Sequence, residues 1–178
     1  MRRALRVAAG AALALLAAGA AAHGKAHQHG HVALDVAVEA RTVAILLEMP
    51  LDSLVGFERA PRTDAERARV AAAVARLRAA DALFVIDPAA GCKLAQVAIT
   101  SAALGLGAGG GQAGDEGHAD LDATIEFSCA DASRARFIDV GLFEAFARVQ
   151  RIDAQVVAGR GQSKRALRRP ERRLELAR

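Results

Sequence analysis

Residues 31–39 alternate strictly between polar and apolar side chains, and this period of two constrains the fold more than any other feature of the chain. The apolar set is Val32, Leu34, Val36 and Val38. Because successive side chains of a strand point to opposite faces, the pattern predicts a half-buried strand. The alternation resumes over 43–49 and stops at Pro50. We therefore expect residues 43–49 to be the hairpin partner of the first strand.

The remaining segments predict one main helix and further strands. Thr63 and Glu66 match a capping box, and apolar residues follow at helical spacing, which predicts a helix over about 64–80. Other segments predict strands at 82–87, 92–100, 118–129 and 137–140, short helical turns within 51–57 and 142–149, and a hairpin from 152–157 and 162–167. The expected fold is α+β, with a mostly antiparallel sheet.

The first 22 residues have the composition of a signal peptide. Arginines at positions 2, 3 and 6 precede an apolar run over 7–22, which is shorter than the roughly 20 residues of a spanning helix and ends in small residues. We expect cleavage after Ala20 or Ala22, export, and no stable membrane insertion afterwards; a membrane anchor is the alternative. Residues 23–167 are expected to form one domain, followed by a basic tail over 168–178 that is loose after Pro170.

Charge is distributed unevenly along the chain. The net charge is +4, but residues 23–159 hold 13 Lys and Arg against 18 Asp and Glu, a net of −5. A nucleic-acid-binding domain places its basic residues on the folded body, and one that binds single strands needs aromatic side chains for stacking. Aromatic residues make up only 3% of this chain, with no Trp or Tyr. We therefore expect no nucleic-acid partner, and an acidic body suits a cation.

Cys92 and Cys129 are the two cysteines of the chain. An even number of cysteines in an exported protein favours a disulfide, and closing a loop of about 37 residues would contribute roughly 3–4 kcal/mol. The alternative is a pair of thiolate zinc ligands.

Residues 31–39 and 118–126 share His, Leu, Asp, a β-branched residue and Glu at identical spacing. The match arises either from two pseudo-symmetric halves or from chance in a chain of low compositional variety. In the first case His31 and His118 occupy equivalent places.

Histidine is the residue type that points most directly to a metal. Four of the five histidines, at positions 23, 27, 29 and 31, fall within nine residues. If the first strand extends back to residue 27, the last three share its polar face with Asp35. Residues i and i+2 of a strand lie about 6.5–7 Å apart, so two imidazoles at this spacing can bind one Zn(II).

His118 and Asp120 repeat the i, i+2 relation at the second unit. We expect His29, His31 and His118 to be the metal ligands, with His27 as a further ligand. Asp120 is a weaker fourth ligand or orients an imidazole, and Asp35 is the fallback. The alternatives are a solvated amino-terminal tail for His23 and His27, and an ordinary surface histidine at 118.

Cleavage after Ala20 would place His23 third from the new amino terminus, which is a chelate for Cu(II) or Ni(II). The sequence contains no phosphate-binding Gly-x-x-x-x-Gly-Lys loop, no Gly-x-Ser-x-Gly elbow and no His-Glu-x-x-His. We therefore expect a protein that is not an enzyme.

A set of short segments is distinctive when taken together: His27-x-His29-Gly30 before an alternating strand, Leu54-Val-Gly-Phe-Glu58, Ala60-Pro61-Arg-Thr-Asp64, Gly91-Cys92, His118-Ala-Asp120, Phe127-x-Cys129 and Leu142-Phe-x-x-Phe146. These segments resemble the ZrgA-like family of periplasmic zinc-uptake proteins. Together they span nearly all of 27–167. The resemblance implies an α+β fold and a periplasmic zinc binder that serves a zinc ABC-type transporter.

The chain departs from this family at two places. Arg59 stands where the family often has His, and a glycine-rich stretch over 106–117 stands where many members carry a His- and Asp-rich insertion. The resemblance therefore implies fewer bound ions in this chain. The competing functions are a structural or adaptor domain of a transporter and a metal-dependent hydrolase, which would need an open coordination position and a general base.

Overall fold

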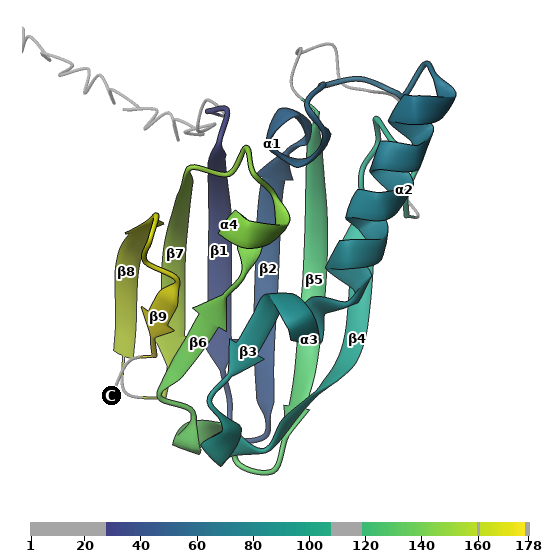
Figure 1. Cartoon of the computed structure of the whole chain (residues 1–178). Coiled ribbons are helices and arrows are strands. Elements are labelled where there is room, and N and C mark those ends of the chain that lie inside the picture. The colour runs from purple at the N-terminus through teal and green to yellow at the C-terminus, as the bar shows by residue number, and fades with distance from the viewer. Residues whose placement is uncertain (1–27, 108–118, 160, 177–178) are drawn as a thin grey trace, which may run out of the picture.

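The computed structural model describes residues 28–107, 119–159 and 161–176. Within these ranges the chain forms a six-stranded sheet in the order β4-β5-β2-β1-β7-β8 (Figure 1). Its strands are β1 (His31–Val38), β2 (Thr42–Pro50), β4 (Cys92–Thr100), β5 (Asp120–Cys129), β7 (Arg151–Ala158) and β8 (Gly161–Arg168). Neighbouring strands are antiparallel, except that β1 and β7 are parallel.

A second layer covers one face of this sheet. It contains a small sheet, β3 (Phe84–Ile86), β6 (Phe137–Val140) and β9 (Arg173–Glu175), together with α2 (Asp64–Arg78), α3 (Ala80–Leu83) and α4 (Leu142–Ala145). Figure 1 shows these elements in front of the large sheet, while α1 (Leu51–Val55) lies at its end. The predicted α+β fold with a mostly antiparallel sheet is confirmed.

The core lies between the two layers and follows the predicted alternation. The side chains of Val32, Leu34 and Val36 in β1 are at most 2% exposed, and Leu121 and Ile125 in β5 are fully buried. Burying side chains of this size stabilises the fold by about 1.5–3 kcal/mol each relative to exposure. The described part of the chain leaves the opposite face of the large sheet uncovered, and this face carries both polar residues of β1 and β2, such as Asp35 and Glu48, and the apolar Leu46.

The main helix begins where the capping box predicts. The Thr63 hydroxyl accepts a hydrogen bond from the Glu66 N–H at 3.1 Å, and the Glu66 carboxylate accepts one from the Thr63 N–H. These two bonds satisfy donors that the first turn of a helix leaves without intrahelical partners. The helix ends at Arg78, two residues before the predicted end.

Two predictions about secondary structure are wrong in part or in full. The predicted strand 82–87 is confirmed over Phe84–Ile86, which form β3, but Ala82 and Leu83 belong to the helical turn α3, where Ala80 and Leu83 are buried. The chain after Pro170 is not loose: β9 pairs with β6, and Leu174 and Leu176 are buried. Their i, i+2 spacing places both on the core side of a short strand.

The disulfide between Cys92 and Cys129 is present. The two residues face each other in the β4–β5 pair, so the bridge ties the edge strand β4 to its neighbour. This confirms the predicted pairing.

The two units of the sequence repeat correspond to β1 and β5, which flank β2 on either side. The next strand after β1 is β2, which pairs with it directly, whereas the next strand after β5 is β6, which belongs to the small sheet. The chain therefore follows a different course after each unit.

The predicted signal peptide lies outside the described residues, as do His23, His27 and His118. In the part of the chain that the structure describes, no helix has both the length and the apolar character needed to cross a membrane.

Candidate metal site

One end of the large sheet collects the segments that carry the predicted ligands. Strands β1, β5 and β7 begin at this end, β2 ends there, and α1 follows directly (Figure 1). The Leu51 N–H donates a hydrogen bond to the Ala119 carbonyl at 2.8 Å, and Asp120 pairs with Pro50. The residue that directly follows His118 in the chain is therefore fixed beside the first residue of α1.

A tight turn precedes β1 and fixes the position of His29. Gly30 has φ +80°, and its N–H donates to the Ser53 hydroxyl at 2.8 Å. A Cβ at this position would lie 3.1 Å from the carbonyl oxygen of Arg148, so both the backbone conformation and the available space favour glycine. The Gly30 carbonyl in turn accepts hydrogen bonds from the backbone N–H groups of Gln150 and Arg151.

The imidazole of His29 lies between two carboxylates. Its Nε2 is 3.0 Å from Oε1 of Glu58, and its Nδ1 is 3.9 Å from Oδ2 of Asp52. Asp52 belongs to α1, and Glu58 lies in the loop after it. The imidazole is 61% exposed, whereas the two carboxylates are about one-fifth exposed. A solvent-accessible nitrogen donor therefore faces two partly buried oxygen donors.

His31 points elsewhere. Its Nδ1 is 4.0 Å from Oδ2 of Asp153, a carboxylate that already accepts hydrogen bonds from Arg151 Nε at 2.8 and 2.9 Å. His31 and Asp35 line one groove of about 770 Å³ on the uncovered face, together with Glu48 and Asp153. Three basic side chains, Arg151, Lys164 and Arg165, face the three carboxylates of this groove, so its lining carries no net negative charge to attract a cation.

The condition for a shared polar face, a strand that reaches back to residue 27, is not met. Strand β1 begins at His31, and the turn at Gly30 interrupts the alternation. His31 and Asp35 do share the uncovered face, but His29 lies in the turn and contacts the α1 region.

Asp120 is half-buried at the start of β5, where its carbonyl accepts a hydrogen bond from the Ser101 hydroxyl at 2.7 Å. Across residues 28–107, 119–159 and 161–176, no three His, Cys, Asp or Glu side chains are grouped so that they could hold a metal ion. The pair of His29 and Glu58 could supply two ligands of a metal ion.

The side chain of Arg59 turns toward α2. Its guanidinium donates to both carboxylate oxygens of Glu66, at 3.0 and 2.7 Å, and lies 5.1 Å from the ring centroid of Phe57. This hydrogen bonding, together with the Arg62 and Thr63 N–H groups, lowers the pKa of Glu66 to about 2. Arg59 therefore fastens the loop after α1 to the start of the main helix.

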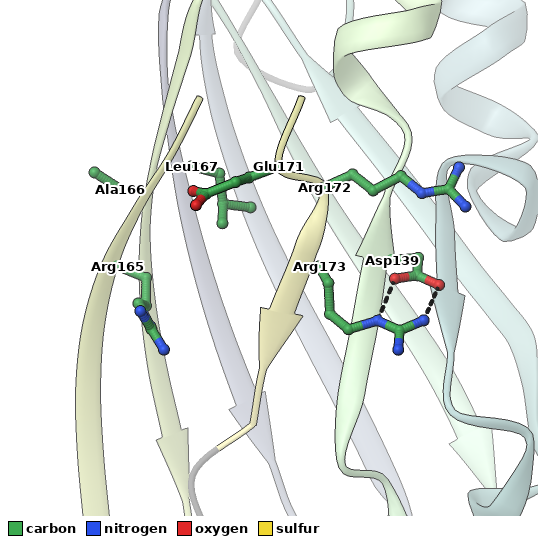
Figure 2. Close-up of a pocket in the computed structure, with 7 residues that line it drawn as sticks. All are labelled: Asp139, Arg165, Ala166, Leu167, Glu171, Arg172 and Arg173. Carbon is green, nitrogen blue, oxygen red and sulfur yellow. Dashed lines mark hydrogen bonds and ion pairs between the residues drawn. The ribbon is translucent and has the colours of Figure 1, made fainter. Parts of the chain in front are cut away.

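A second groove, of about 380 Å³, lies between β8 and β9 (Figure 2). Arg173 donates two hydrogen bonds of 2.8 Å to Asp139, and this guanidinium lowers the pKa of Asp139. Arg165, Arg172 and Glu171 complete the charged lining. Three arginines against two carboxylates leave this groove positive, which disfavours a metal cation.

Asp52 and Glu58 were not among the ligands expected from the sequence. Glu58 closes the Leu-Val-Gly-Phe-Glu block that distinguishes the resemblance, so the sequence held a signal for it. No signal in the sequence pointed to Asp52, because its proximity to His29 depends on the turn at Gly30 and on α1 following β2 without a linker.

Comparison with known proteins gives the family. No curated protein matches the chain at a significant level. The family model described as ZrgA family zinc uptake protein matches residues 26–176, which include every strand from β1 to β9. The chain belongs to the ZrgA family of zinc uptake proteins.

Proposed function

We propose that this protein is an exported, periplasmic zinc carrier that captures Zn(II) and passes it to an uptake system such as an ABC-type transporter, without catalysing a reaction. Membership of a zinc uptake family supports the metal and the process. The net charge of −5 over 23–159 favours a cation over an anion. The contact between His29 and Glu58 is the observation on which the proposed site rests.

The separation of that pair suits a zinc ion. Two ligands on a tetrahedral zinc with bonds of about 2.0–2.2 Å lie roughly 3.3 Å apart. The Nε2 of His29 and Oε1 of Glu58 are 3.0 Å apart, so a small outward shift of the two side chains would admit the ion between them. Imidazole and carboxylate are both ordinary zinc ligands.

Two histidines outside the described residues are proposed to complete the ligand set. His27 precedes His29 by two residues, and His118 precedes Ala119, whose carbonyl is bonded to Leu51 beside Asp52. Asp120 is proposed as a weaker ligand or as a carboxylate that orients an imidazole. His31, beside Asp153, is proposed to contribute less than His29.

The exposure of His29 fits transfer rather than permanent storage. A site whose nitrogen ligand is 61% exposed can be reached by a partner that replaces the ligands one at a time. A structural zinc site, in contrast, is closed by four protein ligands.

Titration of the mature protein with Zn(II) against a chromophoric chelator tests the proposal. We expect about one tight equivalent, at least tenfold weaker binding in His29→Ala and in Glu58→Gln, and weaker binding in His118→Ala. His31→Ala is the matched control and should change the affinity less than His29→Ala.

Wild-type protein without saturable zinc uptake would instead favour a structural or adaptor domain. Unchanged affinity in His29→Ala would contradict the proposed site. Turnover of an ester or peptide that a chelator abolishes would favour a hydrolase.

A further inference from the structure

Arg148 lies against the same carboxylate as His29. Its Nη1 is 3.5 Å from Oδ1 of Asp52, while Oδ2 of that carboxylate faces Nδ1 of His29 at 3.9 Å. The contacts thus run in series from Arg148 through Asp52 to His29 and on to Glu58. In this series Arg148 is the member that brings positive charge to a site proposed for a cation.

The backbone holds Arg148 in this position. It lies in the loop between α4 and β7. The last loop residue, Gln150, and the first residue of β7, Arg151, donate hydrogen bonds to the Gly30 carbonyl at 2.8 and 3.0 Å. The loop is therefore fastened to the turn that carries His29, which holds the backbone of Arg148 near this site.

The guanidinium also packs against α1. A Cβ at Gly56 would lie 3.1 Å from both Nε and Nη2 of Arg148, and Gly56 has φ +87° at the end of α1. Because Gly56 has no side chain, the flat guanidinium of Arg148 fits beside Asp52. Two independent contacts, with Gly56 and with Asp52, therefore set its place.

A histidine that binds zinc through one ring nitrogen commonly donates its other N–H to a carboxylate, which orients the ring and strengthens the ligand. Asp52 stands on the Nδ1 side of His29, opposite Glu58 on the Nε2 side. A cation that engages the other oxygen of Asp52 draws charge away from the imidazole and also repels a divalent ion nearby.

We propose that Asp52 orients His29 and that Arg148, by pairing with Asp52, lowers the zinc affinity of the site and speeds release. The inference rests on the proposed function, since it concerns the affinity of that site. Arg148 is a positioning residue that acts through Asp52 and is not itself a ligand. A carrier must release its ion to a partner, and this ion pair keeps binding weak enough for transfer.

The test measures zinc affinity and the rate of zinc transfer to a chelator in Arg148→Gln, Arg148→Lys and Arg165→Gln. Arg148→Gln should bind zinc roughly three- to tenfold more tightly and release it correspondingly more slowly. Arg148→Lys, which keeps the charge, should stay near wild type. Arg165→Gln removes the same charge from the exposed surface of β8 and should leave both quantities unchanged.

A double-mutant cycle with Asp52→Asn separates action through the ion pair from general charge repulsion. The effect of Arg148→Gln should largely disappear in the Asp52→Asn background. An equal effect in that background, an equal effect of Arg165→Gln, or unchanged affinity in Arg148→Gln would overturn the inference. Absence of zinc uptake by the wild-type protein would overturn the proposed function instead, so the two failures are distinguishable.

Discussion

At the scale of single residues, a glycine decides which histidine meets which carboxylate. His29 and His31 are two positions apart and would share a face in a continuous strand, but the positive φ of Gly30 separates them. His29 then contacts Glu58, and His31 turns to Asp153. The spacing of the two histidines does not reveal this separation, because a left-handed turn just before a strand does not disturb the alternation within the strand.

Glu66 is a residue whose lowered pKa links the stability of the fold to pH. Its pKa is lowered to about 2, chiefly by the hydrogen bonds from Arg59, whereas an unfolded glutamate titrates near 4.5. A depressed pKa in the folded state stabilises the protein above about pH 4.5, and that contribution is lost as the pH falls toward 2.

We therefore expect Glu66→Gln to be less stable than wild type at pH 7, with the difference narrowing between about pH 4.5 and pH 2. Urea midpoints measured over this range provide the check, with Glu144→Gln, an exposed glutamate of α4, as the control. A difference between wild type and Glu66→Gln that stays constant with pH would contradict this assignment.

At the scale of secondary-structure elements, the sequence predicts most of the large sheet. Alternating polar and apolar residues predict β1, β2 and β5, because each of these strands buries one face and exposes the other. The capping box likewise locates the start of α2. These signals are local, so no knowledge of the rest of the fold is required.

The elements that the sequence does not predict depend on tertiary contacts. Strand β9 has only three residues in a highly charged segment, and its pairing with β6 gives it order. The helical turn α3 has only four residues, and the burial of Ala80 and Leu83 on one side depends on the surrounding fold. The contact of His29 with Asp52 and Glu58 is likewise tertiary and joins segments more than 20 residues apart.

Leu174 tests whether β9 is part of the folded core. It is fully buried, so Leu174→Ala should lower the free energy of unfolding by about 2–5 kcal/mol, the range for large-to-small changes in a core. Leu46→Ala, at a side chain that is 55% exposed on the uncovered face, should cost much less. Chemical unfolding of the two variants makes the comparison, and equal small losses would mean that the carboxy-terminal segment adds little to the fold.

At the scale of the whole molecule, the topology brings three separate stretches of chain to one end of the sheet. The start of β1, the segment that follows β2 and the start of β5 meet there because β2 lies between β1 and β5 and runs antiparallel to both. The basic carboxy-terminal region lies on β8 and β9, at the far side of the sheet from β4 and β5.

The proposed imidazole ligands predict how zinc binding depends on pH. Imidazole must lose its proton to bind a metal, so the affinity of the mature protein should fall as the pH drops below about 6.5. Titrations at several pH values between 5.5 and 8 check this, and an affinity that does not change over this range would indicate ligands other than histidine.

Anomalous diffraction at the zinc edge from crystals of the zinc-loaded protein tests the central claim most directly. The account predicts one strong peak at about 2.0–2.1 Å from Nε2 of His29 and within bonding distance of a carboxylate oxygen of Glu58. A peak in the groove beside His31 and Asp153, or any single strong peak without contact to His29, would contradict it.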